Sequence, residues 1–178
     1  RTLATLRETA ADSSRILAAI EALSHGLRER VGESLKEVRA SQPLARVTTS
    51  SLPALRKAVE ANEEERWGSR ARGIRLMNEA LELDPGFAWA WHGLAIMHYN
   101  DNNMALALAA AEQAVEHEDR LTELERYQAR SMRASIVGDL AEARRLDLDR
   151  IARDTTNVVA HINVSDVAWN QGDWDTAV

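Results

Sequence analysis

The stretch from Gly68 to Pro85, GSRARGIRLMNEALELDP, carries a pattern of small, turn and apolar residues that returns along the chain. Small residues stand at intervals of 34, 36 and 34, at Ala61, Ala95, Ser131 and Ser165. A second small series has the same intervals, at Gly73, Ala107, Ala143 and Ala177. Turn residues follow at Gly68, Asn102, Gly138 and Gly172, and large residues at Trp91, Tyr127 and His161. The columns agree on one two-residue insertion near Asp119 to Glu123, which indicates a genuine repeat.

A repeat of this length predicts units of two antiparallel helices joined by a tight turn. Small residues let the two helices approach closely, and Gly or Asn tolerates the left-handed conformation that closes the first helix. One helix pair cannot bury its apolar face, whereas stacked pairs can. The sequence therefore predicts an all-α solenoid, with almost no strand signal apart from a weak one over residues 2–9.

These residues resemble the tetratricopeptide repeat (TPR). Gly68 to Gly73 and Ala80 to Pro85 are similar to its second helix and closing proline, and Trp91, Leu94 and Ala95 to the next opening helix. The resemblance implies a right-handed superhelix with units at roughly 54–87, 88–121, 124–157 and 158 onward, the last of them cut short near Val178. Arg150 departs from the pattern, because it replaces the small residue found at Ala80 and Ala114, and this puts the tightness of the third unit in doubt.

An amphipathic helix is predicted before the repeats. Apolar residues recur every three or four positions from Ile16 to Val38, without sustaining three clean heptads. Breakers then run from Ser41 to Ser51, and Pro53 suits the first turn of a new helix. We therefore divide the chain into an N-terminal junction, 1–50, and a TPR array of about three and a half repeats, 51–178.

A second resemblance concerns the junction. Residues 7–12 (RETAAD), 27–35 (LRERVGESL) and 43–51 (PLARVTTSS), together with 121–127 (LTELERY), are similar to large bacterial signalling proteins. Those proteins couple a serine/threonine kinase, cyclase or DNA-binding output to a TolB-like module followed by TPR units. The resemblance implies a bacterial multidomain regulator whose output domain lies outside this chain, with residues 1–50 beginning at the end of a TolB-like module. It implies a cytoplasmic location by default, or the periplasmic side of a membrane-anchored regulator.

Composition and motifs disfavour several functional classes. The net charge is -6 and no basic stripe is present, so nucleic acid is not an expected partner. No apolar run is long enough to insert this segment into a membrane. Phosphate-binding glycine loops, a nucleophile elbow and cysteines are absent, and the five histidines lack the spacing of a helical zinc site. The sequence therefore predicts no enzyme activity, no cofactor and no metal.

The predicted binding surface is the concave groove lined by the first helix of each unit. Its candidate partner-binding residues lie on one face of successive first helices, at Trp89, His92, Ile96, Tyr99, Asn100, Gln128, Met132, Trp169 and Asn170. Aromatic area beside polar handles favours a protein or peptide ligand. The alternative is that Trp89 and Trp169 pack against other parts of a parent protein.

Two partner hypotheses stay open. In the first, the groove recruits a protein or peptide. Ligand segments that bear arginine or aromatic residues suit the net negative charge of this chain. Some TPR domains grip a terminal carboxylate, but here the corresponding positions hold Ala58, Gly93, Glu125 and Ala129, with only Asn62 matching. An acidic tail is therefore not the expected ligand. In the second, the chain is a structural module that forms a homo-oligomer through the helix from Ile16 to Val38.

Overall fold

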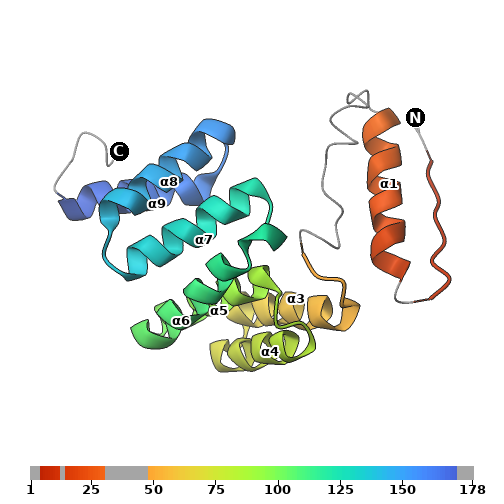
Figure 1. The fold of residues 1–178 in the computed structure, drawn as a ribbon, viewed down its shortest axis with the longest axis horizontal. Coiled ribbons are helices and arrows are strands. Elements are labelled where there is room, and N and C mark those ends of the chain that lie inside the picture. The colour runs from red at the N-terminus through yellow and green to blue at the C-terminus, as the bar shows by residue number, and fades with distance from the viewer. Residues whose placement is uncertain (1–4, 13–14, 31–47, 172–178) are drawn as a thin grey trace.

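The computed structural model describes residues 5–12, 15–30 and 48–171, and within these ranges every regular element is helical. The described residues form eight α-helices, one before the repeats and seven that build them (Figure 1). Their bounds are α1 Ile16–Arg30, α3 Leu52–Trp67, α4 Arg70–Leu83, α5 Ala88–Asn100, α6 Met104–Glu116, α7 Glu123–Ile136, α8 Leu140–Arg153 and α9 Val158–Gln171. The predicted all-α solenoid is confirmed.

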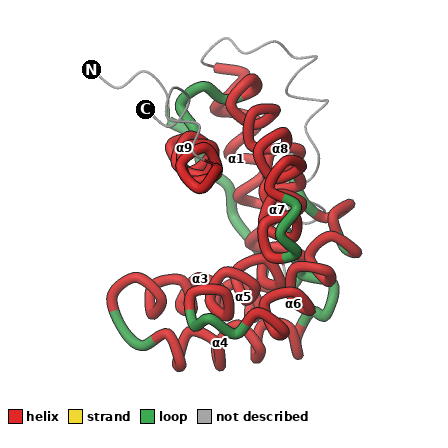
Figure 2. The backbone as a smooth tube through the Cα atoms, turned by 90° about the vertical axis from the view of Figure 1, so that its left-hand side faces the viewer, coloured by secondary structure: helices red, strands yellow, loops and turns green. Residues whose placement is uncertain are grey.

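The helices pair in chain order. α3 packs on α4, α5 on α6, and α7 on α8, while α9 packs on α8 (Figures 1 and 2). Each pair also packs on the next, because α4 contacts α5 and α6 contacts α7. The first helices of neighbouring units meet as well, since α5 contacts both α3 and α7. α5 thus lies at the centre of the stack, in keeping with an apolar character on most of its sides.

Polar side chains define where the helices begin. Ser51 caps α3 by accepting a hydrogen bond from the backbone N–H of Ala54, and Pro53 sits in the first turn, as the sequence predicted. Thr122 and Glu125 form a capping box at the start of α7. The Glu125 carboxylate is therefore engaged at the start of α7 by Thr122 and does not project as a free group into the groove.

The predicted left-handed turns are present in two of the units. Asn102 has φ 57° and Gly138 has φ 80°, so both adopt the backbone conformation that Asn and Gly tolerate. The prediction for Gly68 is wrong, because its φ is -130°. There a side chain would instead meet the Glu64 carboxylate, which accepts a hydrogen bond from the backbone N–H of Ser69. Gly172 lies outside the described residues.

The two series of small residues face each other inside the helix pairs. A Cβ placed on Gly73 would lie 3.0 Å from the carbonyl oxygen of Ala61 and 3.5 Å from the Met97 side chain. In the third unit, the hydroxyl of Ser131 lies 3.5 Å from the carbonyl oxygen of Ala143. At these positions, the contact between the first and the second helix of a unit therefore leaves room only for a very small side chain.

The third unit contains a buried polar network where the repeat pattern predicted a small residue. Arg150 is 2% exposed and donates to Asp147, itself 1% exposed, at 2.6 Å. Asp147 also accepts hydrogen bonds from Ser131 at 2.6 Å and Asn163 at 3.2 Å, and Arg150 donates to Asn157 at 3.1 Å. The network joins α7, α8 and α9. The sequence left the tightness of the third unit in doubt because Arg150 replaces a small residue. In the structure, hydrogen bonds of Arg150 and Asp147 hold the helices of this unit together.

The two-residue insertion forms a short 3-10 helix, η2 (Glu118–Arg120), which ties consecutive units together. Arg120 donates to both carboxylate oxygens of Asp84, at 2.9 and 2.7 Å. Thr49 donates to the same carboxylate at 2.5 Å. Hydrogen bonds from Arg120 are the main reason that the pKa of Asp84 lies below its ordinary value. The insertion therefore supplies the arginine that clamps the end of the first unit.

The described part of the N-terminal segment consists of the helix α1 and the non-helical residues 5–12 that precede it. Leu6 packs on α1 at Gly26, and Arg30 donates to the carbonyl oxygen of Thr5 at 3.2 Å. Residues 5–10 adopt no strand, contrary to the weak signal in the sequence. The predicted extension of the helix to Val38 lies outside the described residues. No helix in the described ranges is long and apolar enough to cross a membrane.

The buried network makes the effect of Arg150→Ala testable. By the repeat pattern, alanine here would tighten the third unit, but in this fold it strands the buried Asp147 carboxylate. We expect Arg150→Ala to lower the free energy of unfolding by about 3–5 kcal/mol, and Asp147→Ala/Arg150→Ala to cost less, because no unpaired charge remains. Urea unfolding followed by circular dichroism measures both. The exposed Arg75→Ala is the matched control, and a neutral or stabilising Arg150→Ala would contradict the network's role.

Candidate functional site

A pocket of about 400 Å³ opens where the first helices of three units meet. Its walls come from α5, α7 and α9, with one residue from the start of α8. The lining residues are His92, Ile96, Tyr99, Asn100, Gln128, Ser131, Met132, Ser135, Leu140, Val159, Asn163, Asp166 and Val167. The volume falls within the range of about 300–1,000 Å³ that is usual for ligand sites in proteins.

Helical spacing explains why these residues share the pocket. Ile96 follows His92 by four residues, and Tyr99 and Asn100 follow Ile96 by three and four, so all four residues lie on one face of α5. Gln128, Met132 and Ser135 do the same on α7. In the stack, both of these faces line the same pocket as residues of α9. Six predicted site residues are therefore brought together: His92, Ile96, Tyr99, Asn100, Gln128 and Met132.

The other three predicted residues do not line this pocket. Trp89 lies near the start of α5 and stacks on Phe87, with ring centroids 5.9 Å apart, and it packs against the apolar core. It shares a helix face with Tyr99, but ten residues of helix separate them by about 15 Å along the axis. Trp169 is 64% exposed on α9, outside the lining. Asn170 belongs to α9, but its side chain lies outside the described part of the chain.

The structure adds lining residues that the sequence argument missed. Asn163 and Val167 face the pocket from α9, whereas the neighbouring Ile162 does not line it. Ile162 is 53% exposed and points elsewhere. The signal was present in the sequence, because Asn163 follows Val159 by four residues and precedes Asp166 by three. Leu140 could not have been found this way, since it comes from a second helix.

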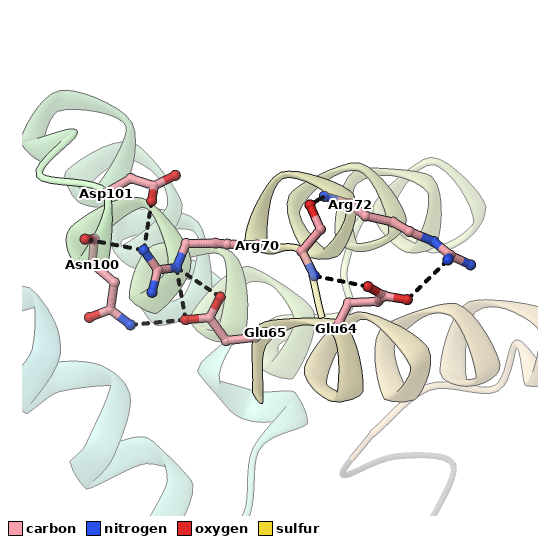
Figure 3. Close-up of polar contacts among 7 residues, drawn as sticks. Glu64, Glu65, Arg70, Arg72, Asn100 and Asp101 are labelled. Carbon is pink, nitrogen blue, oxygen red and sulfur yellow. Dashed lines mark hydrogen bonds and ion pairs between the residues drawn. The ribbon is translucent and has the colours of Figure 1, made fainter. Parts of the chain in front are cut away.

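Asn100 has a structural task as well as a place in the lining. Its side-chain amide donates to Glu65 at 3.1 Å, and Glu65 accepts from Arg70 at 2.9 Å (Figure 3). Arg70 also reaches Asp101 at 2.8 Å. These contacts join the ends of α3 and α5 to the start of α4. The rim of the pocket at Asn100 is thus fixed to the first unit, and its amide nitrogen is already engaged.

His92 is the most unusual residue of the pocket. It is 8% exposed, and neither ring nitrogen has a hydrogen-bond partner among the described residues. Burial lowers the pKa of His92 to about 4, with a smaller contribution from the positive charge of Arg150. The imidazole is therefore neutral at pH 7, and it presents one acceptor and one donor that the protein itself leaves unused.

The remaining polar groups of the pocket differ in how far they are engaged. Ser131 and Asn163 donate to the buried Asp147, so they are held in place from behind. Gln128, Ser135 and Asp166 form no side-chain hydrogen bond or ion pair within the described residues. Tyr99 is 41% exposed, so its ring stands at the opening. The pocket therefore combines a fixed floor with free polar groups above it.

Two further hollows are less suited to enclosing a ligand. The larger, about 600 Å³, runs along the end of α3 and is lined only by residues between Val59 and Gly68, including Trp67. One helix cannot surround a ligand. The other, about 360 Å³, lies over α4, α5 and α6 and is lined by Asn78, Trp91, Leu94, His98, Leu106, Ala109, Ala110 and Gln113. Of these three hollows in the described part of the chain, the pocket at His92 is the one whose walls come from three units.

The depressed pKa of His92 predicts a specific loss of stability in acid. The unfolded chain takes up a proton near pH 6.5, whereas the folded chain does so only near pH 4. The free energy of unfolding therefore falls as the pH drops from about 6.5 to 4, by on the order of 3 kcal/mol from this residue, and is unaffected by it above that window.

Urea unfolding at several pH values, with His92→Leu as the comparison, measures this contribution. Both proteins share every other titrating group, including Tyr99 and Asp166 in the pocket and the paired Asp147 and Arg150 beneath it. The stability of wild type should therefore fall more steeply than that of the variant. Parallel curves would show that His92 does not titrate as its burial implies.

Two solved structures have a similar fold. The first TPR of Spaghetti (RPAP3), bound to the HSP90 peptide SRMEEVD, aligns with a TM-score of 0.54 and 16% identity, over 68% of this chain and 95% of that one. MamA 41-end from Desulfovibrio magneticus RS-1 aligns with a TM-score of 0.52 and 15% identity, over 94% and 91%. No family model and no curated protein matches the sequence. At these identities the likeness concerns the fold, and the chain has a TPR-like fold.

Proposed function

We propose that this chain is a non-catalytic interaction module that binds a protein or peptide in the pocket between α5, α7 and α9. The observation that carries the proposal is the meeting of three first helices around one pocket, with unengaged polar groups beside exposed aromatic and apolar side chains. Such a mixture suits a peptide or helix anchored by one or two side chains. The solved TPR domain bound to a peptide supports the same class of function.

The charge of the pocket argues against an acidic ligand. Among its lining residues none is basic, and Asp166 is acidic. The positions that would grip a terminal carboxylate are also unsuitable here. Ala58 and Ala129 are fully buried, and Glu125 is held in the capping box. The peptide in the Spaghetti complex, SRMEEVD, ends in acidic residues, so this chain would select a different kind of segment.

Photo-crosslinking tests the location of binding. A benzoylphenylalanine at Tyr99 is expected to cross-link a partner from bacterial lysate, whereas the same group at Trp67, 88% exposed on α3, is the matched control. Tyr99→Ala/Met132→Ala should lose capture while circular dichroism shows unchanged helicity. Trp89→Ala is a poor probe, because Trp89 is partly buried and packs against the core. Equal cross-linking from both sites, or capture that survives the double substitution, would place binding elsewhere.

The second candidate function is self-association. α1 exposes Ile20 and Leu27, 47% and 52% accessible, on its apolar stripe, and in Figure 1 it stands apart from the helix pairs. A second copy could cover this stripe. The cross-linking experiment separates the two functions, because cross-links between copies of this chain, abolished by Leu23→Glu/Leu27→Glu, would favour self-association.

We also propose that the module serves a bacterial multidomain regulator, by default in the cytoplasm. The similarity of residues 7–51 and 121–127 to the junctions of such proteins supports this context. The coding sequence on either side of this segment should then encode a TolB-like module and a kinase, cyclase or DNA-binding output. A reading frame that carries neither would contradict the proposal.

A further inference from the structure

The charge inside the pocket points to the chemistry of its occupant. Asp166, on the exposed side of α9, is the one acidic residue of the lining, which contains no lysine or arginine. Beneath the pocket, Asp147 and Arg150 lie 2.6 Å apart and offset each other. Because Asp166 forms no ion pair within the described residues, its negative charge is unopposed. A cationic group entering the pocket would therefore be favoured over a neutral or anionic one.

His92 adds a demand for hydrogen bonds. A buried polar group without a partner is costly, at about 1–3 kcal/mol, and such groups are rare in folded proteins. The neutral imidazole at the inner wall has one nitrogen that accepts a hydrogen bond. Gln128 and Ser135, on the neighbouring helix α7, also have side-chain oxygens that accept no hydrogen bond within the described residues. The pocket thus offers several acceptors at different depths, in addition to the carboxylate.

The remaining walls suit an apolar stem and a flat cation. Ile96, Met132 and Val159 supply aliphatic surface, and the half-exposed ring of Tyr99 stands beside them. An aromatic face attracts a cation placed over it. A ligand that combines an apolar stem, a planar positive charge and several N–H donors would use every part of this lining.

We propose that the pocket recognises an arginine side chain presented by a partner protein. This rests on the proposed function and names the ligand class of the same site. The guanidinium pairs with Asp166, stacks on Tyr99 and donates to the acceptors of Gln128 and His92, while its methylene stem lies on the aliphatic wall. Lysine carries the charge and three N–H donors, but its compact ammonium lacks the planar five-donor fork and the flat face that stacks on an aromatic ring. Citrulline keeps the shape and loses the charge.

A positional-scanning library of nonapeptides tests the assignment. Each pool has one fixed central residue and random flanks, and binding to the full chain is measured by fluorescence polarisation. Arginine pools should bind at least about tenfold more tightly than lysine or citrulline pools. Asp166→Asn should weaken the arginine pool by about ten- to a hundredfold and leave the citrulline pool nearly unchanged. Glu112→Gln, which removes an exposed carboxylate on α6, is the matched control and should change nothing.

His92→Leu supplies the second readout. It should weaken the arginine pool by several fold while the preference for arginine over citrulline, which Asp166 determines, is retained. Circular dichroism of each variant confirms that it is folded.

The outcomes separate this inference from the proposed function. Selection of another central residue, or an arginine preference that survives Asp166→Asn, overturns the arginine assignment and leaves the module function standing. If all pools bind with equal affinity and Tyr99→Ala/Met132→Ala does not change that affinity, both the arginine assignment and the proposed function are overturned.

Discussion

The close approach of the two helices within each unit is the constraint on which the rest of the structure depends. Where Ala61 meets Gly73, a single added carbon would already touch backbone at 3.0 Å. Such a short separation lets each pair bury its apolar faces between neighbours, which an isolated pair could not do. It also fixes how far apart successive first helices lie. The small residues therefore contribute to the shape of the pocket between α5, α7 and α9, and one of them, Ser131, lines it.

The third unit meets the same constraint with different chemistry. Buried charge is costly unless it is paired and hydrogen-bonded. Asp147 and Arg150 pair with each other and bond to Ser131, Asn157 and Asn163, while the Nε of Arg150 has no partner among the described residues. Apolar contacts are non-directional, whereas these bonds require particular orientations of three helices. The network thus fixes α9 against α7, and it positions Ser131 and Asn163 as the floor of the pocket. It also places Arg150 near His92, where its charge helps keep the imidazole neutral.

Ionic links between units hold the walls of the pocket in register. Arg70 joins the end of α5 to the first unit through Glu65 and Asp101 (Figure 3), and Arg120 returns from the insertion to Asp84. A site whose walls are preorganised loses less entropy when a ligand binds. The unpartnered ring of His92 and the unopposed carboxylate of Asp166 are then the groups with most to gain from an occupant. His92 belongs to α5, which the Arg70 links hold, and Asp166 belongs to α9, which the hydrogen bond from Asn163 to Asp147 ties to α8.

The sequence by itself determined the helix pairs, their 34-residue spacing and the faces of α5 and α7 that share the pocket, because these follow from local periodicity. It also supplied six of the lining residues, since residues on one helix face stay together in any packing. Only the tertiary structure decided that Trp89 packs against the core, that Arg150 is buried with Asp147, and that His92 has no hydrogen-bond partner among the described residues. Those properties depend on which residues distant in the chain come within a few ångströms, and periodicity carries no information about that. The rotation of α9, which brings Asn163 and not Ile162 to the pocket, is likewise a tertiary property. It buries Ala160, Val164, Val167 and Ala168 and lets Asn163 donate a hydrogen bond to Asp147.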